Sequence, residues 1–325
     1  MTEKINVGIV GYGNLGKGAE KAIKRNPDFR LVSIFSRRGA GKGEGDVAIA
    51  DYKDLANYQG KIDLMLMCGG SATDLPEQVP WVARWFNTVD TFDTHGKIPT
   101  YFAKVDQAAR QADKLSMIST GWDPGLFSLA RVLFASALPT GINNTFWGRG
   151  VSQGHSDALR RVEGVLDAKS YTIPLESALE AASAGTGKEY TPQQSHSREC
   201  YVVAAPDSDL RVIEEKILTM PEYFAPYDTR VYFVSQETLN REHGALPHGG
   251  RVIRAGIAGE DSRDLMELRL TLESNPEFTS SVMLCFARAA WRLYREGRRG
   301  AVSPLDAPIG YLSPRDGETL RRESL

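Results

Sequence analysis

The chain has 325 residues, which is long enough for about two domains with a substantial hydrophobic core. Its 39 Lys and Arg residues nearly balance its 41 Asp and Glu residues, so the formal charge of −2 gives no support for nucleic-acid binding. No apolar run approaches the roughly 18 residues of a membrane span, and the first strand is expected too early for a cleavable signal, so we expect a cytoplasmic protein without a membrane partner.

The first predicted strand ends in a glycine-rich turn. Residues 5–10 are apolar apart from Asn6, and Gly11-Tyr12-Gly13-Asn14-Leu15-Gly16 follows directly. Glycines at this spacing allow a tight turn, a close backbone approach to a pyrophosphate and close packing of a helix on the sheet. A helix that begins near Asn14 presents free N–H groups to the anion. The turn therefore predicts a nicotinamide dinucleotide site.

The second predicted strand, residues 30–35, ends in Ser36-Arg37-Arg38. An NAD site usually has Asp or Glu after this strand, where the acid holds the ribose 2′-OH. A hydroxyl and two guanidiniums instead suit the 2′-phosphate of NADP, and we expect no acid to repel it. The alternative is a solvated basic loop that includes Lys42.

The rest of the first half alternates between strands and helices, which predicts a doubly wound parallel sheet covered on both faces. We expect strands at 62–67, 88–92 and 115–119, and helices at 74–86 and 97–113. Asp93 and Asp123 follow two of these strands, at the edge where parallel strands collect ligands. Two carboxylates there would bind an ammonium group and bias its proton loss. Helix capping by Asp93 and turn formation by Asp123 are the alternatives.

The pattern changes after residue 121 and predicts an α+β domain with an antiparallel or mixed sheet. We expect strands at 145–147, 168–173, 199–203 and 229–234, a helix at 209–220 and a loop at 183–194. An apolar stripe within 282–293 predicts a packing helix, and the arginines at its end are expected to be solvated. The predicted domains are a dinucleotide-binding domain, 1–121 completed by 276–325, and a substrate and dimerisation domain, 122–275.

Polar residues and glycines stand together at several points of the second domain. Gly154 follows Gln153, and Gly249-Gly250 follows His248, which favours close approach of the backbone to a ligand. A lone histidine is more often structural, and spacing does not decide between the two roles. The five histidines form no metal motif and the three cysteines form no C-x-x-C pair, so we expect reduced thiols and no metal.

Six motifs together resemble the meso-diaminopimelate D-dehydrogenase family over nearly the whole chain. Residues 153–161 are the most distinctive part of the resemblance. The motifs are Gly-Tyr-Gly-Asn-Leu-Gly at 11–16, Phe-Ser-Arg-Arg at 35–38, Gly-Ser-Ala-Thr-Asp at 70–74, Ser-Thr-Gly-Trp-Asp-Pro-Gly at 119–125, Ser-Gln-Gly-His-Ser-Asp-Ala-Leu-Arg-Arg at 152–161 and Met-Pro-Glu-Tyr-Phe at 220–224.

The resemblance implies NADP-dependent, reversible oxidative deamination at the D-centre of meso-2,6-diaminopimelate. It also implies a homodimer and a place in lysine and cell-wall precursor synthesis. In the family, the equivalents of Arg198, Thr172 and His248 hold the distal L-amino-acid end, whereas the two aspartates lie nearer the reacting end. Implied substrate contacts are Asp93, Asp123, Trp147, Gln153, Gly154, Thr172, Arg198, His248 and Asn275.

The resemblance also implies a set of cofactor contacts at the ends of the predicted strands. Two positions depart from the family pattern: Gly69 stands where Met is more common, and Phe92 where Tyr is usual. Implied cofactor contacts are Gly11, Tyr12, Gly13, Asn14, Leu15, Gly16, Ser36, Arg37, Arg38, Cys68, Gly69, Gly70, Ser71, Thr91, Phe92, Asp93, Thr120, Gly121, Trp122, Asp123, Pro124 and Gly125.

Two other functions stay open on the residues alone. A dinucleotide-binding domain hosts many chemistries, so a dehydrogenase of another alcohol or carbonyl compound is one alternative. A regulatory protein that binds NADP without turnover is the other. Release of ammonia with reduction of NADP distinguishes an amino-acid dehydrogenase from both.

Overall fold

The computed structural model describes residues 4–45, 47–186, 188–221, 223–260 and 262–325. Glu222, within the motif at 220–224, lies outside the described residues. Contacts divide the chain into two compact units, Met1–Leu129 with Pro276–Leu325, and Ala130–Asn275. The first unit thus extends eight residues beyond the expected boundary at 121. Leu126 and Leu129 pack against its core, which explains the extension.

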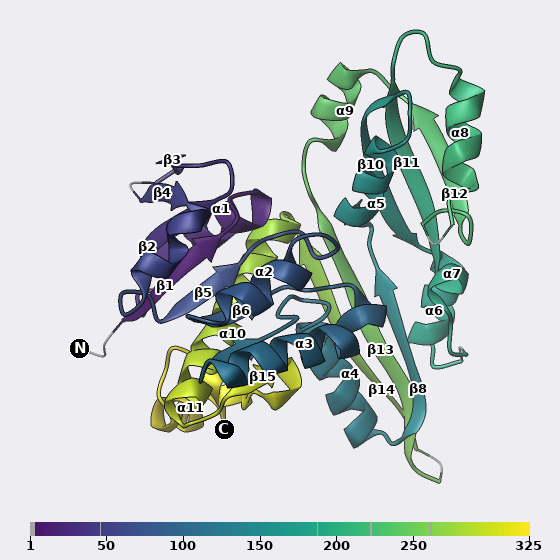
Figure 1. Cartoon of the computed structure of the whole chain (residues 1–325). Coiled ribbons are helices and arrows are strands. Elements are labelled where there is room, and N and C mark those ends of the chain that lie inside the picture. The colour runs from purple at the N-terminus through teal and green to yellow at the C-terminus, as the bar shows by residue number, and fades with distance from the viewer. Residues whose placement is uncertain (1–3, 46, 187, 222, 261) are drawn as a thin grey trace. The chain divides into compact units, whose positions relative to one another are not determined.

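The first unit is built on an eight-stranded sheet in the order β15-β7-β6-β5-β1-β2-β4-β3 (Figure 1). All neighbours are parallel except the short β3–β4 pair. The strands are β1 (Ile5–Val10), β2 (Phe29–Ser36), β3 (Gly41–Lys42), β4 (Ala48–Asp51), β5 (Leu64–Met67), β6 (Asn87–Asp90), β7 (Leu115–Met117) and β15 (Gly300–Val302). The predicted doubly wound sheet is confirmed.

Alternation along the central strands explains why helices cover both faces. In β5, Leu64 and Leu66 join one core cluster, whereas Met65 and Met67 join another, and all four are fully buried. The first cluster includes residues of α1 (Asn14–Lys24) and α10 (Asn275–Arg295), and the second includes residues of α2 (Leu75–Val82) and α3 (Ile98–Gln111). A strand that is apolar on both faces forms only between two such layers.

The second unit contains two smaller sheets. A four-stranded mixed sheet has the order β12-β11-β10-β9, and a three-stranded antiparallel sheet has the order β14-β13-β8. The prediction of an α+β domain is confirmed. The strands are β8 (Thr140–Trp147), β9 (Gly150–Ser152), β10 (Val165–Pro174), β11 (His196–Ala204), β12 (Asp228–Phe233), β13 (His248–Gly259) and β14 (Ser262–Leu272).

Helices α5 to α9 pack on these two sheets, whereas α4 spans the boundary between the two units. Phe146 and Ile253 form a core with Leu179 on the three-stranded sheet, and Ile213 and Phe224 belong to the core of the four-stranded sheet. The helices are α4 (Leu126–Ala137), α5 (Gln153–Arg160), α6 (Glu176–Ser183), α7 (Pro192–Ser195), α8 (Leu210–Leu218) and α9 (Gln236–His243).

The expected loop at 183–194 is partly wrong, because it includes the start of α7. This helix forms because Thr191 and Gln194 make a reciprocal capping box.

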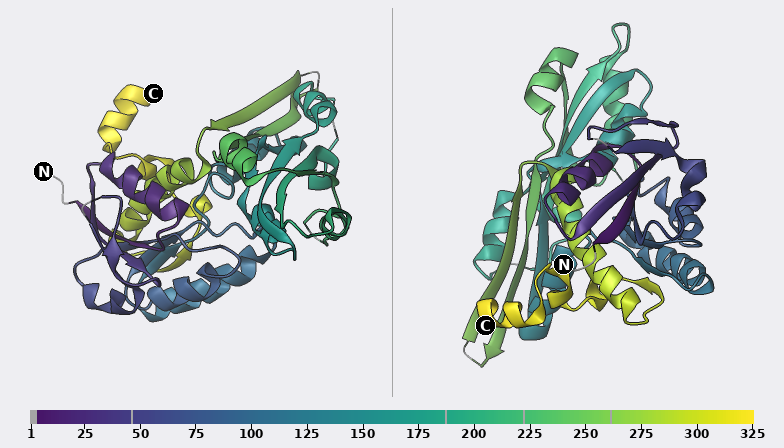
Figure 2. Two further views of the ribbon diagram at one scale, coloured as in Figure 1. Left: turned by 90° about the horizontal axis from the view of Figure 1, so that it is seen from above. Right: turned by 90° about the vertical axis from the view of Figure 1, so that its left-hand side faces the viewer.

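The β13–β14 hairpin was not predicted, although it is the longest strand pairing among the described residues (Figure 2). In β14, Met266, Leu268 and Leu270 alternate with the more exposed Glu267 and Arg269. This period of two is the signal that reveals the strand.

The C-terminal segment, Pro276–Leu325, groups with the first unit, and its arginines are not merely solvated. Arg292 donates to the carbonyls of Gly310 and Tyr311, and Arg299 pairs with Asp113 at 2.8 Å. After α10 the chain continues through β15, η3 (Pro304–Asp306), η4 (Ile309–Leu312) and α11 (Gly317–Ser324). Within the described residues, no helix has the length and apolar character needed to cross a membrane.

Candidate active site

The glycine-rich turn joins β1 to α1. Gly11 has a φ of +92°, and a Cβ there would lie 3.1 Å from the backbone of Cys68. A Cβ at Gly16 would lie 2.1 Å from the carbonyl oxygen of Gly11, so only glycine lets the turn close. A Cβ at Gly13 would meet nothing within 4 Å, which leaves space beside the N-terminus of α1. This arrangement suits a pyrophosphate.

Ser36, Arg37 and Arg38 lie at the end of β2, and both guanidiniums are exposed. The expectation that no acid approaches them is wrong for Arg37, whose Nη2 lies 2.8 Å from Oδ1 of Asp74. Asp74 follows β5, and the spacing along the chain does not show that this loop reaches the end of β2. Because a guanidinium carries five N–H donors, the ion pair leaves Arg37 able to bind a phosphate as well.

The loop after β5 is bonded both within itself and to the loop after β6. Oδ2 of Asp74 accepts a hydrogen bond from the N–H of Gly70 at 2.9 Å. Oγ of Ser71 accepts one from the N–H of Asp93 at 2.9 Å. The structure therefore brings the predicted cofactor segments that begin at Gly11, Ser36, Cys68 and Thr91 to one edge of the sheet.

Asp93 and Asp123 both follow this edge, but their surroundings differ. Asp93 is exposed, and the N-cap of the short helix η2 (His95–Lys97) is Thr94, so the capping alternative for Asp93 is wrong. Asp123 is half-buried within a tight turn in which the N–H of Gly121 donates to the carbonyl of Pro124 at 2.7 Å. The predicted turn at Asp123 is present, and a catalytic role for its carboxylate stays a prediction.

The second unit contains a buried cation, Arg198 on β11, opposite Thr172 on β10. Nη1 of Arg198 donates to Oγ1 of Thr172, and the ring of Tyr227 lies 4.1 Å from its guanidinium carbon. Nε of Arg198 has no hydrogen-bond partner, and among the described residues no carboxylate forms an ion pair with this guanidinium. Burial lowers the pKa of Arg198. A buried guanidinium without an acid is a built site for an anion.

Two histidines near Arg198 are held as neutral bases. Burial and the nearby Arg198 charge lower the pKa of His155 to about 3. The pKa of His248 is lowered by burial as well, and a Cβ at Gly150 would lie 2.4 Å from Cγ of His248, so glycine permits this close packing. Neutral imidazoles add no competing positive charge when an anion enters.

His196, which spacing did not single out, positions Trp147. Nδ1 of His196 lies 2.9 Å from the carbonyl of Pro192, which assigns the proton to Nδ1. Nε2 then accepts the N–H of Trp147 at 2.8 Å, and the two rings stack 5.3 Å apart. Burial lowers the pKa of His196 to about 4. The contact joins β8 of the three-stranded sheet to β11 of the four-stranded sheet, so only the fold of the second unit brings His196 to Trp147.

The structure places the other predicted substrate contacts at element ends. Gln153 and Gly154 begin α5 and are exposed, and a Cβ at Gly154 would meet nothing within 4 Å. Asn275 begins α10, and its N–H donates to the carbonyl of Leu246 at 2.9 Å. The cluster that the structure itself brings together is Thr172, Arg198, His248 and, through His196, Trp147.

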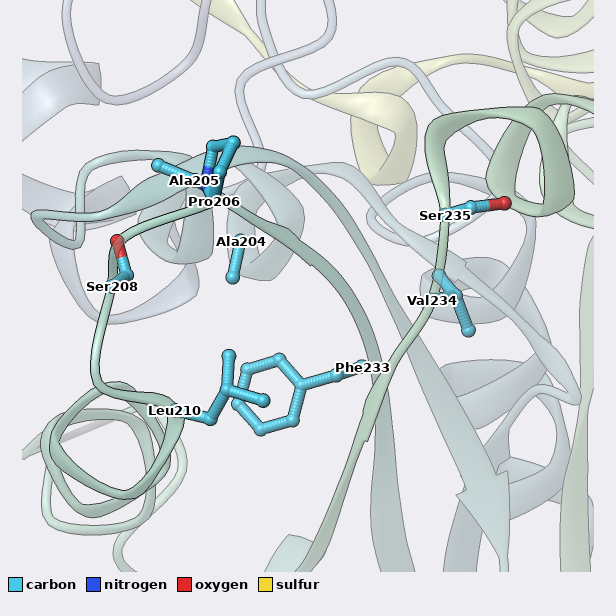
Figure 3. A pocket seen from close by; sticks show the side chains of 8 residues that line it. All are labelled: Ala204, Ala205, Pro206, Ser208, Leu210, Phe233, Val234 and Ser235. Atoms are coloured by element: carbon cyan, nitrogen blue, oxygen red, sulfur yellow. The ribbon is translucent and has the colours of Figure 1, made fainter.

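Neither of two surface hollows in the structure is lined by residues of this cluster. One hollow, of about 420 Å³, lies at the end of β12, and among the lining side chains that Figure 3 labels Ser208 and Ser235 are the polar ones. Another, of about 970 Å³, lies along α2 and α3 and has Arg37 in its lining.

Burial raises the pKa of the Cys68 thiol to about 12, so this thiol is no nucleophile. No group of three potential metal ligands occurs among the described residues.

We predict that stability falls as the pH drops from about 6.5 to 4. The unfolded chain binds protons at histidine near pH 6.5, whereas folded His196 does so only near 4, so the free energy of unfolding decreases by about 1.4 kcal/mol per pH unit for this group. His196→Gln keeps an acceptor for Trp147 without titrating. Urea unfolding across this range should give a shallower slope for His196→Gln than for wild type or the exposed control His95→Gln. Equal slopes would show that His196 is not held neutral.

Comparison with known proteins matches both units. A family model described as the diaminopimelic acid dehydrogenase C-terminal domain matches residues 121–274. The meso-diaminopimelate D-dehydrogenase of Ureibacillus thermosphaericus is 50% identical over 324 residues, with 99% of each chain covered. The protein of the same name from Corynebacterium glutamicum is 44% identical over 316 residues, covering 97% of this chain and 98% of its own.

Solved structures of similar dehydrogenases share the fold of this chain over nearly its whole length. The C. glutamicum diaminopimelate dehydrogenase in complex with diaminopimelate has a TM-score of 0.95 and 43% identity, with 100% of both chains covered. An engineered D-amino acid dehydrogenase bound to NADP⁺ has a TM-score of 0.91 and 42% identity, covering 99% of this chain and 100% of its own. The identity, the coverage and the matching second unit together show that the chain belongs to the meso-diaminopimelate D-dehydrogenase family.

Proposed function

We propose that this chain catalyses the reversible, NADP-dependent oxidative deamination of the D-centre of meso-2,6-diaminopimelate. The products are L-2-amino-6-oxopimelate, which cyclises to tetrahydrodipicolinate, together with ammonia and NADPH. This reaction belongs to the synthesis of lysine and cell-wall precursors. The names of the relatives and the diaminopimelate in a solved family structure support the substrate.

The observation that carries the proposal is the buried guanidinium of Arg198. Its partners in the chain are a hydroxyl and an aromatic ring, and its Nε is unpartnered among the described residues. The distal carboxylate of diaminopimelate supplies the missing negative charge, with Thr172 and His248 as further polar contacts. A short amino acid without a second carboxylate leaves the buried cation uncompensated and is therefore rejected.

The residues at the edge of the first sheet fit NADP. The open side of Gly13 suits the pyrophosphate, and the exposed guanidiniums of Arg37 and Arg38 suit the 2′-phosphate. When bound, NADP supplies the acceptor for the hydride that leaves the D-carbon. We infer that the segments at 11–16, 36–38, 68–71, 91–93 and 120–125 are the cofactor contacts, which makes the first unit the dinucleotide-binding domain.

Asp93 and Asp123 then act on the amino group of the substrate. Their carboxylates hold the ammonium and bias its loss of a proton, so that the nitrogen lone pair can form a C=N bond as the hydride leaves the carbon. Water adds to the resulting imine, and loss of ammonia gives the ketone. Overall, the ammonium form of the substrate, NADP⁺ and one water give the ketone, NADPH, one ammonium ion and one proton, which passes to solvent.

We further propose a cytoplasmic homodimer that assembles through the second unit. Ile142, Ala255 and Leu265 are aligned across β8, β13 and β14, and Ile257 lies two residues along on the same face. Ile142, Ile257 and Leu265 are exposed large apolar side chains. A second copy that covers this row would remove it from water.

The direct test of the proposed function measures ammonia and NADPH together. Wild-type protein with meso-diaminopimelate and NADP should release the two in equal amounts. NADPH formation from an alcohol, without ammonia, would support another class of dehydrogenase instead. Cofactor binding without turnover of any amino acid would support a regulatory protein.

We predict that Arg37 and Arg38 set the preference for NADP. Replacing both with Ala should weaken NADP binding by roughly 1.5–3 kcal/mol per lost charge-assisted bond and change NAD binding little. Lys42→Ala removes a neighbouring positive charge and serves as the control. Calorimetric titration with both cofactors gives the comparison. Equal losses for NADP and NAD, or an equal loss in Lys42→Ala, would show that the arginines do not recognise the 2′-phosphate.

We predict that Asp123 is needed for turnover beyond its role in the turn. Asp123→Asn keeps the size of the side chain and removes the charge that holds the ammonium. The deamination rate should fall by about 100-fold, with NADP binding and thermal stability retained. A normally folded variant that deaminates at the wild-type rate contradicts this assignment.

We predict that Arg198 distinguishes diaminopimelate from shorter amino acids. In Arg198→Met, kcat/KM for diaminopimelate should fall by about 2–5 kcal/mol, whereas activity toward an apolar D-amino acid should fall much less or rise. Arg254→Met is the control, because buried Arg254 is bonded to the carbonyls of Leu138 and Pro139. The ratio of the two efficiencies should change only in Arg198→Met; an unchanged ratio would place the selectivity elsewhere.

A further inference from the structure

A buried carboxylate that has no role in the proposed function lies at the end of β6. Asp90 has no solvent exposure, and three donors meet its side chain. Oδ1 accepts the N–H of Phe92 at 2.9 Å and the N–H of Ser119 at 3.1 Å. Oδ2 accepts the hydroxyl of Tyr101, on α3, at 2.7 Å.

The backbone of Asp90 makes a second set of contacts. Its carbonyl oxygen accepts both the N–H and the hydroxyl of Thr120, each at 2.8 Å. One residue therefore fixes the loop that follows β6 and the loop that follows β7. Ser119 has a φ of +60°, a region that non-glycine residues rarely adopt, and its N–H bond to Asp90 holds it there.

These two loops carry Asp93 and Asp123. Asp93 is one residue beyond the Phe92 N–H, and Asp123 is three residues beyond Thr120 in the tight turn at 121–125. Phe92 also stacks on Tyr101, with ring centroids 4.0 Å apart, so the donor that orients Oδ2 supports the same loop.

We propose that Asp90 is the positioning residue that sets the two predicted catalytic carboxylates, Asp93 and Asp123, in register with each other. The inference rests on the proposed function, because it assigns Asp90 a purpose only if those carboxylates act on the substrate. Asp90 itself touches neither substrate nor cofactor in this account. It acts through the backbone of the two loops.

The chain provides a matched control for a merely structural role. Thr88 lies two residues before Asp90 on β6, and its hydroxyl donates to Oγ of Ser116 on β7 at 2.8 Å. Both side chains are fully buried, and the bond joins the same two strands without reaching either loop. Thr88→Val therefore removes a buried bond between β6 and β7 and leaves the loops anchored.

The experiment compares Asp90→Ala, Asp90→Asn, Tyr101→Phe and Thr88→Val by kcat, KM for meso-diaminopimelate, NADP affinity and thermal midpoint. Asp90→Ala should lower kcat by about 100-fold, the effect expected when reacting groups shift by about 1 Å. Asp90→Asn should restore most of kcat, because its amide oxygen still accepts both N–H groups. Tyr101→Phe should lower kcat to an intermediate degree, and Thr88→Val should lower the midpoint without lowering kcat.

The outcomes separate the inference from the proposed function. If wild type does not deaminate diaminopimelate, the proposed function fails. If wild type is active but Asp90→Ala matches it, or if Thr88→Val loses as much kcat as Asp90→Ala, the positioning role is overturned. Should Asp90→Ala not fold, the comparison of Tyr101→Phe with Thr88→Val decides: a kcat loss confined to Tyr101→Phe supports the inference, and equal values overturn it.

Discussion

A guanidinium that is buried loses its hydration, and other groups must replace the lost interactions with water. The buried arginines of this chain find these groups in different ways. Arg288 in the first unit pairs with Asp28 at 2.5 Å and also donates to the carbonyl of Leu312. Arg254 in the second unit donates to two backbone carbonyls. Arg198 differs, because its Nε is unpartnered among the described residues and the groups around it are neutral. In the proposed function, the distal carboxylate of the substrate offsets the desolvation of Arg198, so affinity and selectivity would both result from one buried charge.

In the first unit, polar side chains hold several loops in place at one edge of the sheet. Parallel strands end together, but their loops take a defined course only where side chains bind them. Asp74 connects the loop after β5 to Arg37, and Ser71 connects the same loop to the N–H of Asp93. Asp90 does the same for the loops after β6 and β7. These short polar side chains let exposed loops hold a fixed geometry, which catalysis by positioned carboxylates requires.

The sequence predicted those parts of the fold that depend on local pattern. The glycine turn and the apolar strands of the first unit follow from neighbouring residues, and so does the change of architecture after residue 121. The β13–β14 hairpin was not predicted because one of its faces is exposed and its strands read as mixed polar sequence. The end of β6 at Asp90, two residues before the expected end, depends on contacts with Ser119 and Tyr101 that come from elsewhere in the chain.

The candidate site also contains residues that local sequence predicts and residues that it does not. Asp93 and Asp123 were identified from their positions after predicted strands, whereas Arg198 and Thr172 were identified only from the family resemblance. The structure gives the latter pair a physical basis, because they face each other across β10 and β11. The contact of Arg37 with Asp74 depends on the strand order of the first sheet, and that of His196 with Trp147 depends on how the two sheets of the second unit meet. No short motif of the sequence encodes either arrangement.

If one end of the two-ended amino acid is held at Arg198 while the other end reacts, the stereoisomers of diaminopimelate should differ sharply as substrates. Rates of ammonia release with NADP should be measured for the meso, LL and DD forms, together with inhibition of the meso reaction by the LL form. We expect turnover of meso, none of LL, competitive inhibition by LL and only slow turnover of DD, whose distal end has the wrong configuration. Oxidation of LL, or a DD rate equal to that of meso, would show that the distal end is not held in this way.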